Sequence, residues 1–164
     1  MTDRIKIASP RDALDIDAIP GLFREDAGSL GFSLDYQDFE AELAGLPGKY
    51  APPEGALLLA TVDGEAAGAV AMRQLEPGIC EMKRLYVRPR YRGERLANGH
   101  SIGRALAHRI VEAGGASGYR RLRLDTIGDR MEAAIRLYRS MGFTEIAPYY
   151  QSPIPGTVYM ELVL

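Results

Sequence analysis

Residues 79–110 read ICEMKRLYVRPRYRGERLANGHSIGRALAHRI, and this stretch decides the fold. Its first ten residues form an apolar-rich run typical of a strand, which Pro89 ends. A turn follows at Arg92 and Gly93, and residues 101–113 then carry apolar side chains at helical spacing. A strand that runs through a glycine turn into a helix brings free backbone N–H groups and the positive end of the helix dipole to one point. The stretch therefore predicts either a turn that binds an anion or a plain surface loop.

The composition is that of one ordinary globular domain spanning residues 1–164. Hydrophobic residues make up 46% and charged residues 26% of the chain, and the formal net charge is -2. This charge predicts no nucleic-acid partner, although most arginines gather in residues 83–123. No apolar run is long enough for a membrane span or a signal core, so we expect no membrane partner. Cys80 is the single cysteine, which excludes a disulfide framework and favours a cytoplasmic location.

The remaining elements follow from apolar periodicity and from turn residues. Strands are expected over 4–8, 56–62, 66–75, 79–88, 121–126, 143–146 and 157–164. Helices are expected from Ser9 to a stop at Pro20-Gly21, then over 36–44, 101–113 and 131–141, the last beginning in a capping box at 129–132. The strands over 79–88 and 121–126 are joined through a helix and should run parallel. The sequence predicts an α/β fold with a mixed, mostly antiparallel central sheet and helices on both faces.

Two common phosphate-binding motifs are absent from the turn. The chain has no Gly-Lys-Ser/Thr of the kind that nucleotide triphosphatases use. It also lacks Gly-x-Gly-x-x-Gly after the first strand with an acidic residue about 20 positions further on. These two nucleotide-binding classes are therefore disfavoured, and a different nucleotide-binding α/β domain stays an alternative.

Four runs taken together resemble the GNAT superfamily of acyl-CoA-dependent N-acetyltransferases. They are CEMKRLYVRPRYRG, IGRALAHRI, RRLRLDT and MEAAIRLYRSMGF, within residues 56–164. The resemblance implies that the fourth and fifth strands are parallel and splayed. It also implies acetyl-CoA as co-substrate, no metal, a primary amine of a small molecule or peptide as acceptor, and direct attack in a ternary complex. A homodimer is common in the family.

The chain departs from the phosphate loop of this family, which reads Arg/Gln-x-x-Gly-x-Gly/Ala. Arg92-Gly93 matches its start and residues 102–106 match its end, but residues 94–99 are extra and Ser101 stands where glycine is usual. The extra residues either bulge outward, or they lengthen the helix or disorder the loop. We favour the first outcome, because lengthening a surface loop costs well under about 1 kcal/mol per doubling. Ser101 is also a good helix N-cap.

The resemblance assigns a set of residues to the cofactor. They are Leu85, Tyr86, Val87, Arg92, Gly93, Ser101, Ile102, Gly103, Arg104, Ala105, Thr126 and Met131. Backbone N–H groups of residues 85–87 are expected to bond the thioester carbonyl and the pantetheine arm. Those of residues 102–105 are expected to bond the diphosphate.

Two residues are candidates for proton transfer. Acylation needs a neutral amine, and Glu81 stands where a family glutamate serves as general base. The alternative is a structural or surface glutamate paired with Lys83 or an arginine. Tyr138 matches the family's general acid, which protonates the departing thiolate, and helical phase places it inward with Ile135 and Met141. The alternative is an ordinary core tyrosine.

Four further residues need an interpretation. Tyr149 and Tyr150 lie in the proline-rich segment APYYQSPIPG, which resembles the wall of an acceptor pocket; a surface loop with packed aromatic rings is the alternative. Cys80 is interpreted as a small buried apolar residue rather than a nucleophile. His108 is expected to face solvent.

The sequence thus predicts an N-acetyltransferase that uses acetyl-CoA. The alternative is a CoA-binding protein of the same fold with little or no catalysis, because its phosphate loop is altered. The acceptor stays open among small amines, aminoglycosides, amino acids, peptide N-termini and lysine side chains. The slight negative charge of the chain weakly favours a cationic acceptor.

Overall fold

The structure is a computed structural model, and it describes residues 4–10, 13–30, 39–127 and 132–164. Its strands are β1 (Ile5–Ala8), β2 (Ala56–Val62), β3 (Glu65–Glu76), β4 (Ile79–Val87), β5 (Arg121–Ile127), β6 (Thr144–Ile146) and β7 (Thr157–Val163). Its α-helices are α1 (Ala13–Leu30), α2 (Phe39–Ala44), α3 (Ile102–Ala116) and α4 (Glu132–Ser140). Short 3₁₀ turns occur at Gly48–Tyr50 and Pro89–Tyr91.

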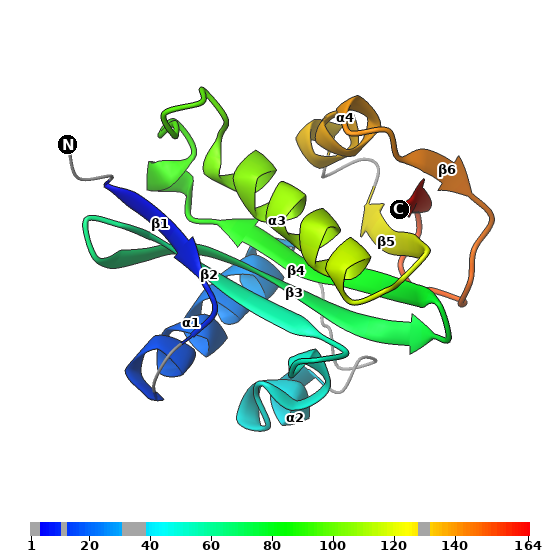
Figure 1. The fold of residues 1–164 in the computed structure, drawn as a ribbon, viewed down its shortest axis with the longest axis horizontal. Helices are drawn as coiled ribbons and strands as arrows, with labels where there is room; N and C mark the ends of the chain where they lie inside the picture. The colour runs from blue at the N-terminus through cyan, green and yellow to red at the C-terminus, as the bar shows by residue number, and fades with distance from the viewer. Residues whose placement is uncertain (1–3, 11–12, 31–38, 128–131) are drawn as a thin grey trace.

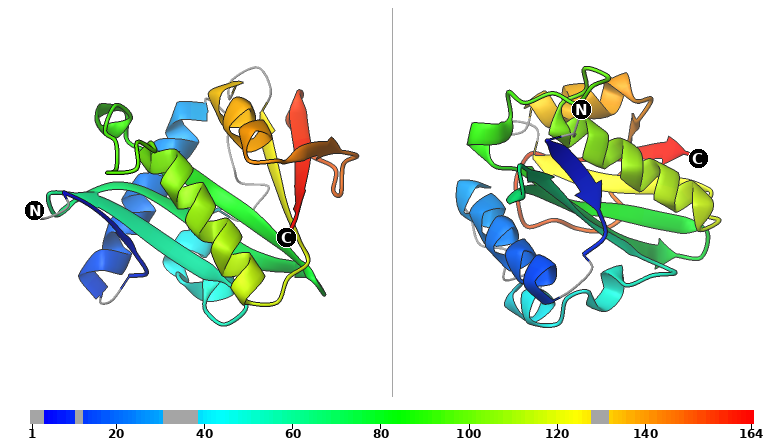
Figure 2. Two further views of the ribbon diagram at one scale, coloured as in Figure 1. Left: turned by 45° about the horizontal axis from the view of Figure 1, so that its top comes forward. Right: turned by 60° about the vertical axis from the view of Figure 1, so that its left-hand side comes forward.

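The seven strands lie in one sheet, in the order β1-β2-β3-β4-β5-β7-β6. The central neighbours β4 and β5 are parallel, and the other neighbouring pairs are antiparallel. Helices α3 and α4 lie on one face of the sheet, and α1 and α2 lie on the other (Figure 1 and Figure 2). The predicted fold class is confirmed.

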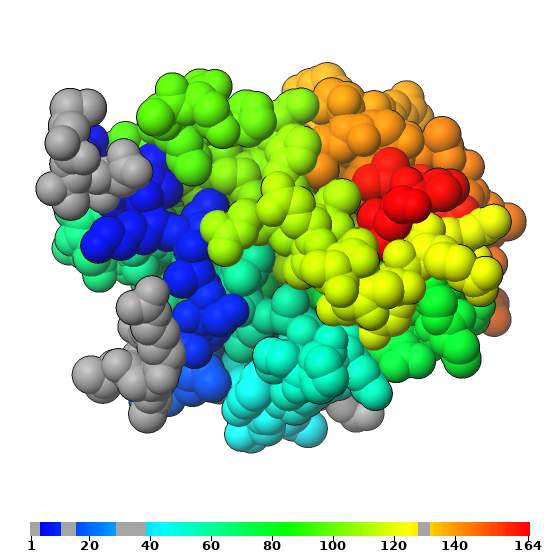
Figure 3. All heavy atoms as spheres, viewed as in Figure 1, coloured from blue at the N-terminus to red at the C-terminus, as the bar shows by residue number. Residues whose placement is uncertain are grey.

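Each face of the sheet has its own hydrophobic core, because successive side chains of a strand point to opposite faces. Ala71 and Met72 are neighbours on β3, yet Met72 packs with Cys80 and Ile110 under α3, whereas Ala71 packs with Phe23 under α1. Cys80 is fully buried, as expected. In the space-filling view the segments of α3 and α4 adjoin on one side of the molecule (Figure 3).

The parallel strands separate soon after they meet. The ladder between them holds three residue pairs, Ile79–Arg121, Cys80–Leu122 and Glu81–Arg123. Strand β4 nevertheless continues to Val87, and β5 continues to Ile127. The expected splay of the fourth and fifth strands is therefore confirmed, and it begins directly after Glu81.

A β-bulge interrupts the pairing of β4 with β3 shortly after Glu81. Ala69 pairs with Tyr86 and Ala71 pairs with Lys83, so two residues of β4 lie opposite one residue of β3. One of them, Arg84, has φ of 63°, a left-handed conformation that costs a non-glycine residue about 1–2 kcal/mol. This bulge supplies a local reason for β4 to leave β5.

Helix α1 is longer than the sequence suggested. The predicted stop at Pro20-Gly21 is wrong, because the helix continues through both residues to Leu30. An interior proline costs a helix about 3 kcal/mol or more. Ile19, Leu22 and Phe23 are fully buried against the sheet, and the burial of three large apolar side chains offsets that cost.

Gly68 provides a test of how closely β3 and β4 approach. A Cβ atom at this position would lie 2.6 Å from the Tyr86 carbonyl oxygen, which is backbone and cannot move aside alone. We expect Gly68→Ala to lower the free energy of unfolding by about 1–3 kcal/mol, measured by urea denaturation. The control is Gly28→Ala in α1, where a Cβ would meet no atom within 4 Å, and it should be neutral or stabilising. Equal stability of Gly68→Ala and the parent would contradict this packing.

Candidate active site

The extra residues of the turn form a compact hairpin outside α3. Arg95 and Ser101 form an antiparallel bridge, and the N–H of Leu96 donates to the His100 carbonyl at 2.9 Å. Gly99 closes the hairpin with φ of 86°. Helix α3 therefore begins at Ile102, as it would without the insertion, and the first of the two outcomes weighed for this loop is the one observed.

The start of α3 carries two N–H groups that have no acceptor within the helix. Ser101 is the N-cap, and its hydroxyl oxygen accepts from the N–H of Arg104 at 3.2 Å. The N–H of Ala105 donates to the Ser101 carbonyl at 3.0 Å. Of the four N–H groups expected to bond the diphosphate, those of Arg104 and Ala105 therefore already have acceptors at Ser101. Ile102 and Gly103 occupy the first helical positions, whose N–H groups have no acceptor within a helix. These two groups and the helix dipole suit an anion.

Arg92 and Arg104, the two arginines expected to meet the anion, have different partners. Arg92 donates from Nε to the Val87 carbonyl at 2.9 Å and lies over the Tyr86 ring at 5.8 Å. Arg104 donates from Nη1 to the Ser140 hydroxyl of α4 at 2.9 Å. Both guanidinium groups keep further N–H donors beyond these contacts.

The opening between β4 and β5 lies next to this helix start. Leu85 and Val87 pack toward the core under α3, whereas Tyr86 packs toward α1. Thr126 is buried on β5. Met131 and the predicted capping box at 129–131 lie outside the described residues.

Tyr138 of α4 is buried and its ring packs against Phe143 with centroids 5.5 Å apart. The expected inward orientation is confirmed. Burial raises the pKa of the Tyr138 hydroxyl well above its usual value, and the charges of Asp26 and Asp125 raise it further. Asp26 belongs to α1, which lies on the opposite face of the sheet from α4 (Figure 1).

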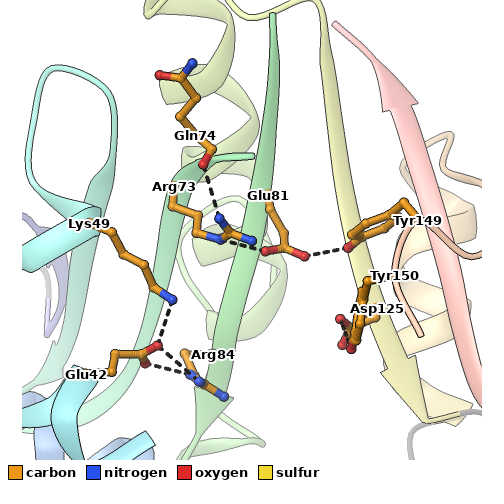
Figure 4. A network of polar contacts seen from close by, with 9 residues as sticks. All are labelled: Glu42, Lys49, Arg73, Gln74, Glu81, Arg84, Asp125, Tyr149 and Tyr150. Carbon is orange, nitrogen blue, oxygen red and sulfur yellow. Dashed lines mark hydrogen bonds and ion pairs between the residues drawn. The ribbon is translucent and has the colours of Figure 1, made fainter. Parts of the chain in front are cut away.

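Glu81 is 2% exposed and lies at the last pair of the parallel ladder. Its Oε1 accepts from Arg73 Nε at 2.9 Å, and its Oε2 accepts from the Tyr149 hydroxyl at 2.6 Å (Figure 4). The glutamate is therefore paired with an arginine, as the structural alternative supposed, and it also lines a cavity of about 420 Å³. This geometry of Glu81 is compatible both with a general base and with a structural ion pair.

The segment after α4 covers this cavity. Tyr149 donates to Glu81, and Tyr150 donates to Asp125 Oδ2 at 2.8 Å (Figure 4). The Tyr159 hydroxyl of β7 donates to the Tyr150 carbonyl at 2.9 Å and fixes the segment to the sheet. Both tyrosines line the cavity and are half-buried, and their rings also pack edge-to-face with each other and with Tyr159 at centroid distances of 5.3–5.6 Å, so both interpretations of this segment remain open.

Asp26 is a further carboxyl group that the sequence did not reveal. Burial raises its pKa to about 6, against the opposing effect of Arg84 and Arg92. A carboxyl group whose pKa lies near neutrality is typical of functional sites. Because periodicity alone does not show which acidic residue of α1 faces the sheet, no sequence signal selected it.

The raised pKa of Asp26 predicts a pH-dependent cost to stability. The folded pKa of Asp26, about 6, lies above the unfolded value of 3.8. The stability contributed by the protonated carboxyl group is therefore fully present below about pH 4 and is lost as pH rises through 6. Asp26→Asn should raise the free energy of unfolding by about 1–3 kcal/mol at pH 8 and by progressively less toward pH 4. Urea denaturation at both pH values tests this. The exposed Asp17 of the same helix gives the control Asp17→Asn, expected within about 0.5 kcal/mol of the parent. A pH-independent effect of Asp26→Asn would contradict the assignment.

His108 differs from its prediction as a solvent-facing residue. Its Nε2 is buried and has no hydrogen-bond partner among the described residues. Its ring stacks on His100 with centroids 5.3 Å apart, because the inserted hairpin lies over this part of α3.

Burial raises the pKa of the Cys80 thiol to about 12, which agrees with an inert residue rather than a nucleophile.

A mixed sheet whose parallel central pair opens beside a free helix N-terminus has the architecture of an acyl-CoA-binding transferase. The acetyltransferase (GNAT) family model matches residues 21–143. An uncharacterized N-acetyltransferase of Schizosaccharomyces pombe is 41% identical over 160 residues, covering 96% of this chain and 94% of that protein. An IAA acetyltransferase of Azospirillum brasilense is 34% identical over 113 residues, covering 68% of this chain and 69% of that protein. The chain therefore belongs to the acetyltransferase (GNAT) family, and the predicted enzyme class is confirmed.

Solved structures agree on the fold. A GNAT-family acetyltransferase from Staphylococcus aureus has a TM-score of 0.76 at 18% identity, covering 96% of this chain and 97% of that one. An acetyltransferase from Salmonella typhimurium, solved with its cofactor acetyl-CoA, has a TM-score of 0.66 at 20% identity, covering 98% and 94%. The alternative of another nucleotide-binding α/β domain is therefore wrong. No helix among the described residues is long and apolar enough to cross a membrane.

Proposed function

We propose that the protein transfers the acetyl group of acetyl-CoA to a primary amine by direct attack in a ternary complex. The observation that carries the proposal is the opening of β4 and β5 after Glu81, beside the start of α3, with Tyr138 buried in the core on the α3 side of the sheet. The cofactor is proposed to lie at the start of α3, and the acceptor in the cavity beside Glu81.

The N–H groups of Ile102 and Gly103 fit a diphosphate. They point out of the first turn of α3, and the Ser101 hydroxyl lies beside them. A Cβ at Gly93 would meet no atom within 4 Å, so the turn leaves room for a ligand. The remaining proposed cofactor contacts are Leu85, Tyr86, Val87, Arg92, Arg104, Ala105, Thr126 and Met131.

The backbone of residues 85–87 is proposed to meet the thioester. Beyond the bulge at Arg84, β4 has no partner on its β5 side in the ladder, so its N–H groups there are available to the pantetheine arm and the acyl oxygen. A backbone N–H aimed at the developing negative charge on that oxygen stabilises the transition state.

Glu81 is proposed to take the proton that the acceptor amine must lose. An amine, or a water molecule bonded to it, reaches Oε2 once it replaces the Tyr149 hydroxyl there. The ion pair with Arg73 holds the other carboxylate oxygen in place. Tyr149 and Tyr150 are proposed to contact the acceptor, because both line the same cavity.

Tyr138 is proposed to supply the proton to the departing sulfur. Its raised pKa keeps the hydroxyl protonated across the physiological range. The N–C bond forms as the C–S bond breaks, Glu81 gains the amine proton, and Tyr138 donates toward the thiolate, so charge is balanced across the step.

Thermal denaturation and thiol release together test the proposal. Acetyl-CoA at about 100 times its dissociation constant should add about 2.7 kcal/mol and raise the melting temperature by about 5–10 °C. Free thiol should appear when an acceptor amine is also present. Stabilisation without thiol release across a broad amine panel would instead indicate a CoA-binding protein. Stabilisation by ATP or NAD but not by CoA would contradict the proposed cofactor.

A further inference from the structure

The pocket beside Glu81 is positively charged, in a chain whose formal net charge is -2. Three cationic side chains line the cavity of about 420 Å³, namely Lys49, Arg73 and Lys83, against the single carboxylate of Glu81. The chain has only three lysines, and two of them lie here. The cations come from the turn before β2, from β3 and from β4, so the fold gathers them from separate segments. Figure 4 shows two of them, Lys49 and Arg73.

The next charges outward do not cancel this excess. Asp125 adds one carboxylate, which accepts from Tyr150. Arg84 and Glu42 form an ion pair with an N–O distance of 2.9 Å and contribute no net charge. One more cation than carboxylates therefore remains around the pocket.

Two of the lining cations retain donors that a ligand can use. Arg73 uses Nε for Glu81 and Nη1 for the Gln74 carbonyl at 3.3 Å, and a guanidinium carries five N–H donors (Figure 4). Lys49 is 44% exposed and its Nζ lies 3.2 Å from Glu42, which occupies one of three ammonium donors.

Lys83 is the most buried of the three lysines. Burial lowers the pKa of its ammonium, and the charges of Glu81 and Asp125 oppose that shift. A cation that has lost much of its water gains more from an anionic ligand than an exposed one does.

We infer that the amine acceptor carries an anionic group, a carboxylate in the simplest case, which Lys49, Arg73 and Lys83 bind. The inference rests on the proposed acetyl transfer and narrows its acceptor. The amine points toward the opening of β4 and β5, and the anionic group stays in the pocket. A cavity of this size suits a ligand such as an amino acid or a short peptide. Like charge disfavours polycationic acceptors such as aminoglycosides.

Matched acceptors test the inference. Thiol release from acetyl-CoA is measured with L-amino acids and short peptides, each beside its methyl ester, which keeps the amine and removes the negative charge. The carboxylate member of the best pair should have a kcat/KM about tenfold higher or more. Peptides whose carboxylate lies at increasing distance from the amine distinguish a free amino acid from a peptide as the source of the group.

Lysine variants test which side chains cause the preference for carboxylate acceptors. Lys83→Met should abolish most of the preference for the carboxylate, and Lys83→Arg should retain most of it. Lys49→Gln should reduce the preference about threefold or more, because one charge-assisted hydrogen bond is lost. The third lysine, Lys6, is exposed on β1, and Lys6→Gln is the control that should keep the preference.

Several results would overturn the inference. Esters or polycationic amines that react as well as the carboxylates would do so, and so would a preference that survives Lys83→Met. If no amine releases thiol, the proposed function fails instead, and calorimetric titration of the CoA-loaded protein decides the inference. Tighter binding of carboxylates than of esters would then support it, and equal or absent binding would reject it.

Discussion

Tyr138→Phe is expected to lower kcat by about 10²–10³-fold while the dissociation constant of CoA changes little. The substitution removes one hydroxyl from a ring that stays packed against Phe143, so the fold should persist. The phenol keeps its proton because burial raises its pKa. The loss of kcat should therefore be nearly constant between about pH 6 and pH 9, because even an unperturbed phenol, with a pKa of about 10, stays protonated there.

Steady-state thiol release, with CoA binding by calorimetry, measures this effect. Tyr119→Phe is the matched control, since the Tyr119 hydroxyl donates to the Glu54 carbonyl at 2.6 Å, away from the opening between β4 and β5. Its kcat should equal that of the parent. A Tyr138→Phe enzyme with kcat within about threefold of the parent would remove Tyr138 from the mechanism and leave it as a core tyrosine.

Glu42→Ala is expected to cost about 3–5 kcal/mol of unfolding free energy, because it leaves the buried guanidinium of Arg84 without its partner. Both side chains are 6% exposed, and the pair is bidentate, with Nε at 2.9 Å and Nη2 at 3.2 Å. Arg84 also has the left-handed φ that forms the bulge in β4. We expect the bulge to relax, and acetyl transfer to fall with it, since the bulge directs β4 away from β5.

Glu40→Ala is the matched control in the same helix. Its ion pair with Arg24 has an N–O distance of 3.3 Å, and both side chains are more than half exposed. Such surface pairs contribute about 0–1 kcal/mol. Urea denaturation compares the two variants, and Glu42→Gln, which keeps an acceptor oxygen, should fall between them. A Glu42→Ala cost no larger than that of Glu40→Ala would show that α2 does not support the bulge.

Much of the fold follows from local patterns in the sequence. Apolar residues bounded by turn residues predicted β2 and β3, and helical spacing predicted α3 to within a few residues. The stop at Pro20 failed because a local rule about proline was outweighed by burial of the residues around it. The local sequence shows that a proline destabilises a helix, but the burial that compensates this cost is visible only in the tertiary structure.

The site was less accessible from sequence for the same reason. Glu81 was a candidate by its place on β4, yet its contact with Tyr149 joins residues 68 positions apart. The pairing of Arg84 with Glu42 spans 42 positions and depends on a bulge that has no glycine to mark it. The gathering of Lys49 and Lys83 in one pocket likewise depends on which segments the sheet brings together.

A crystal structure of the complex with CoA tests the central claim most directly. The account predicts diphosphate oxygens within hydrogen-bond distance of the Ile102 and Gly103 amides, with the pantetheine arm between β4 and β5. It also predicts that the hairpin of residues 94–99 stays outside the ligand. A CoA molecule bound elsewhere, or those two amides turned away from it, would contradict the account.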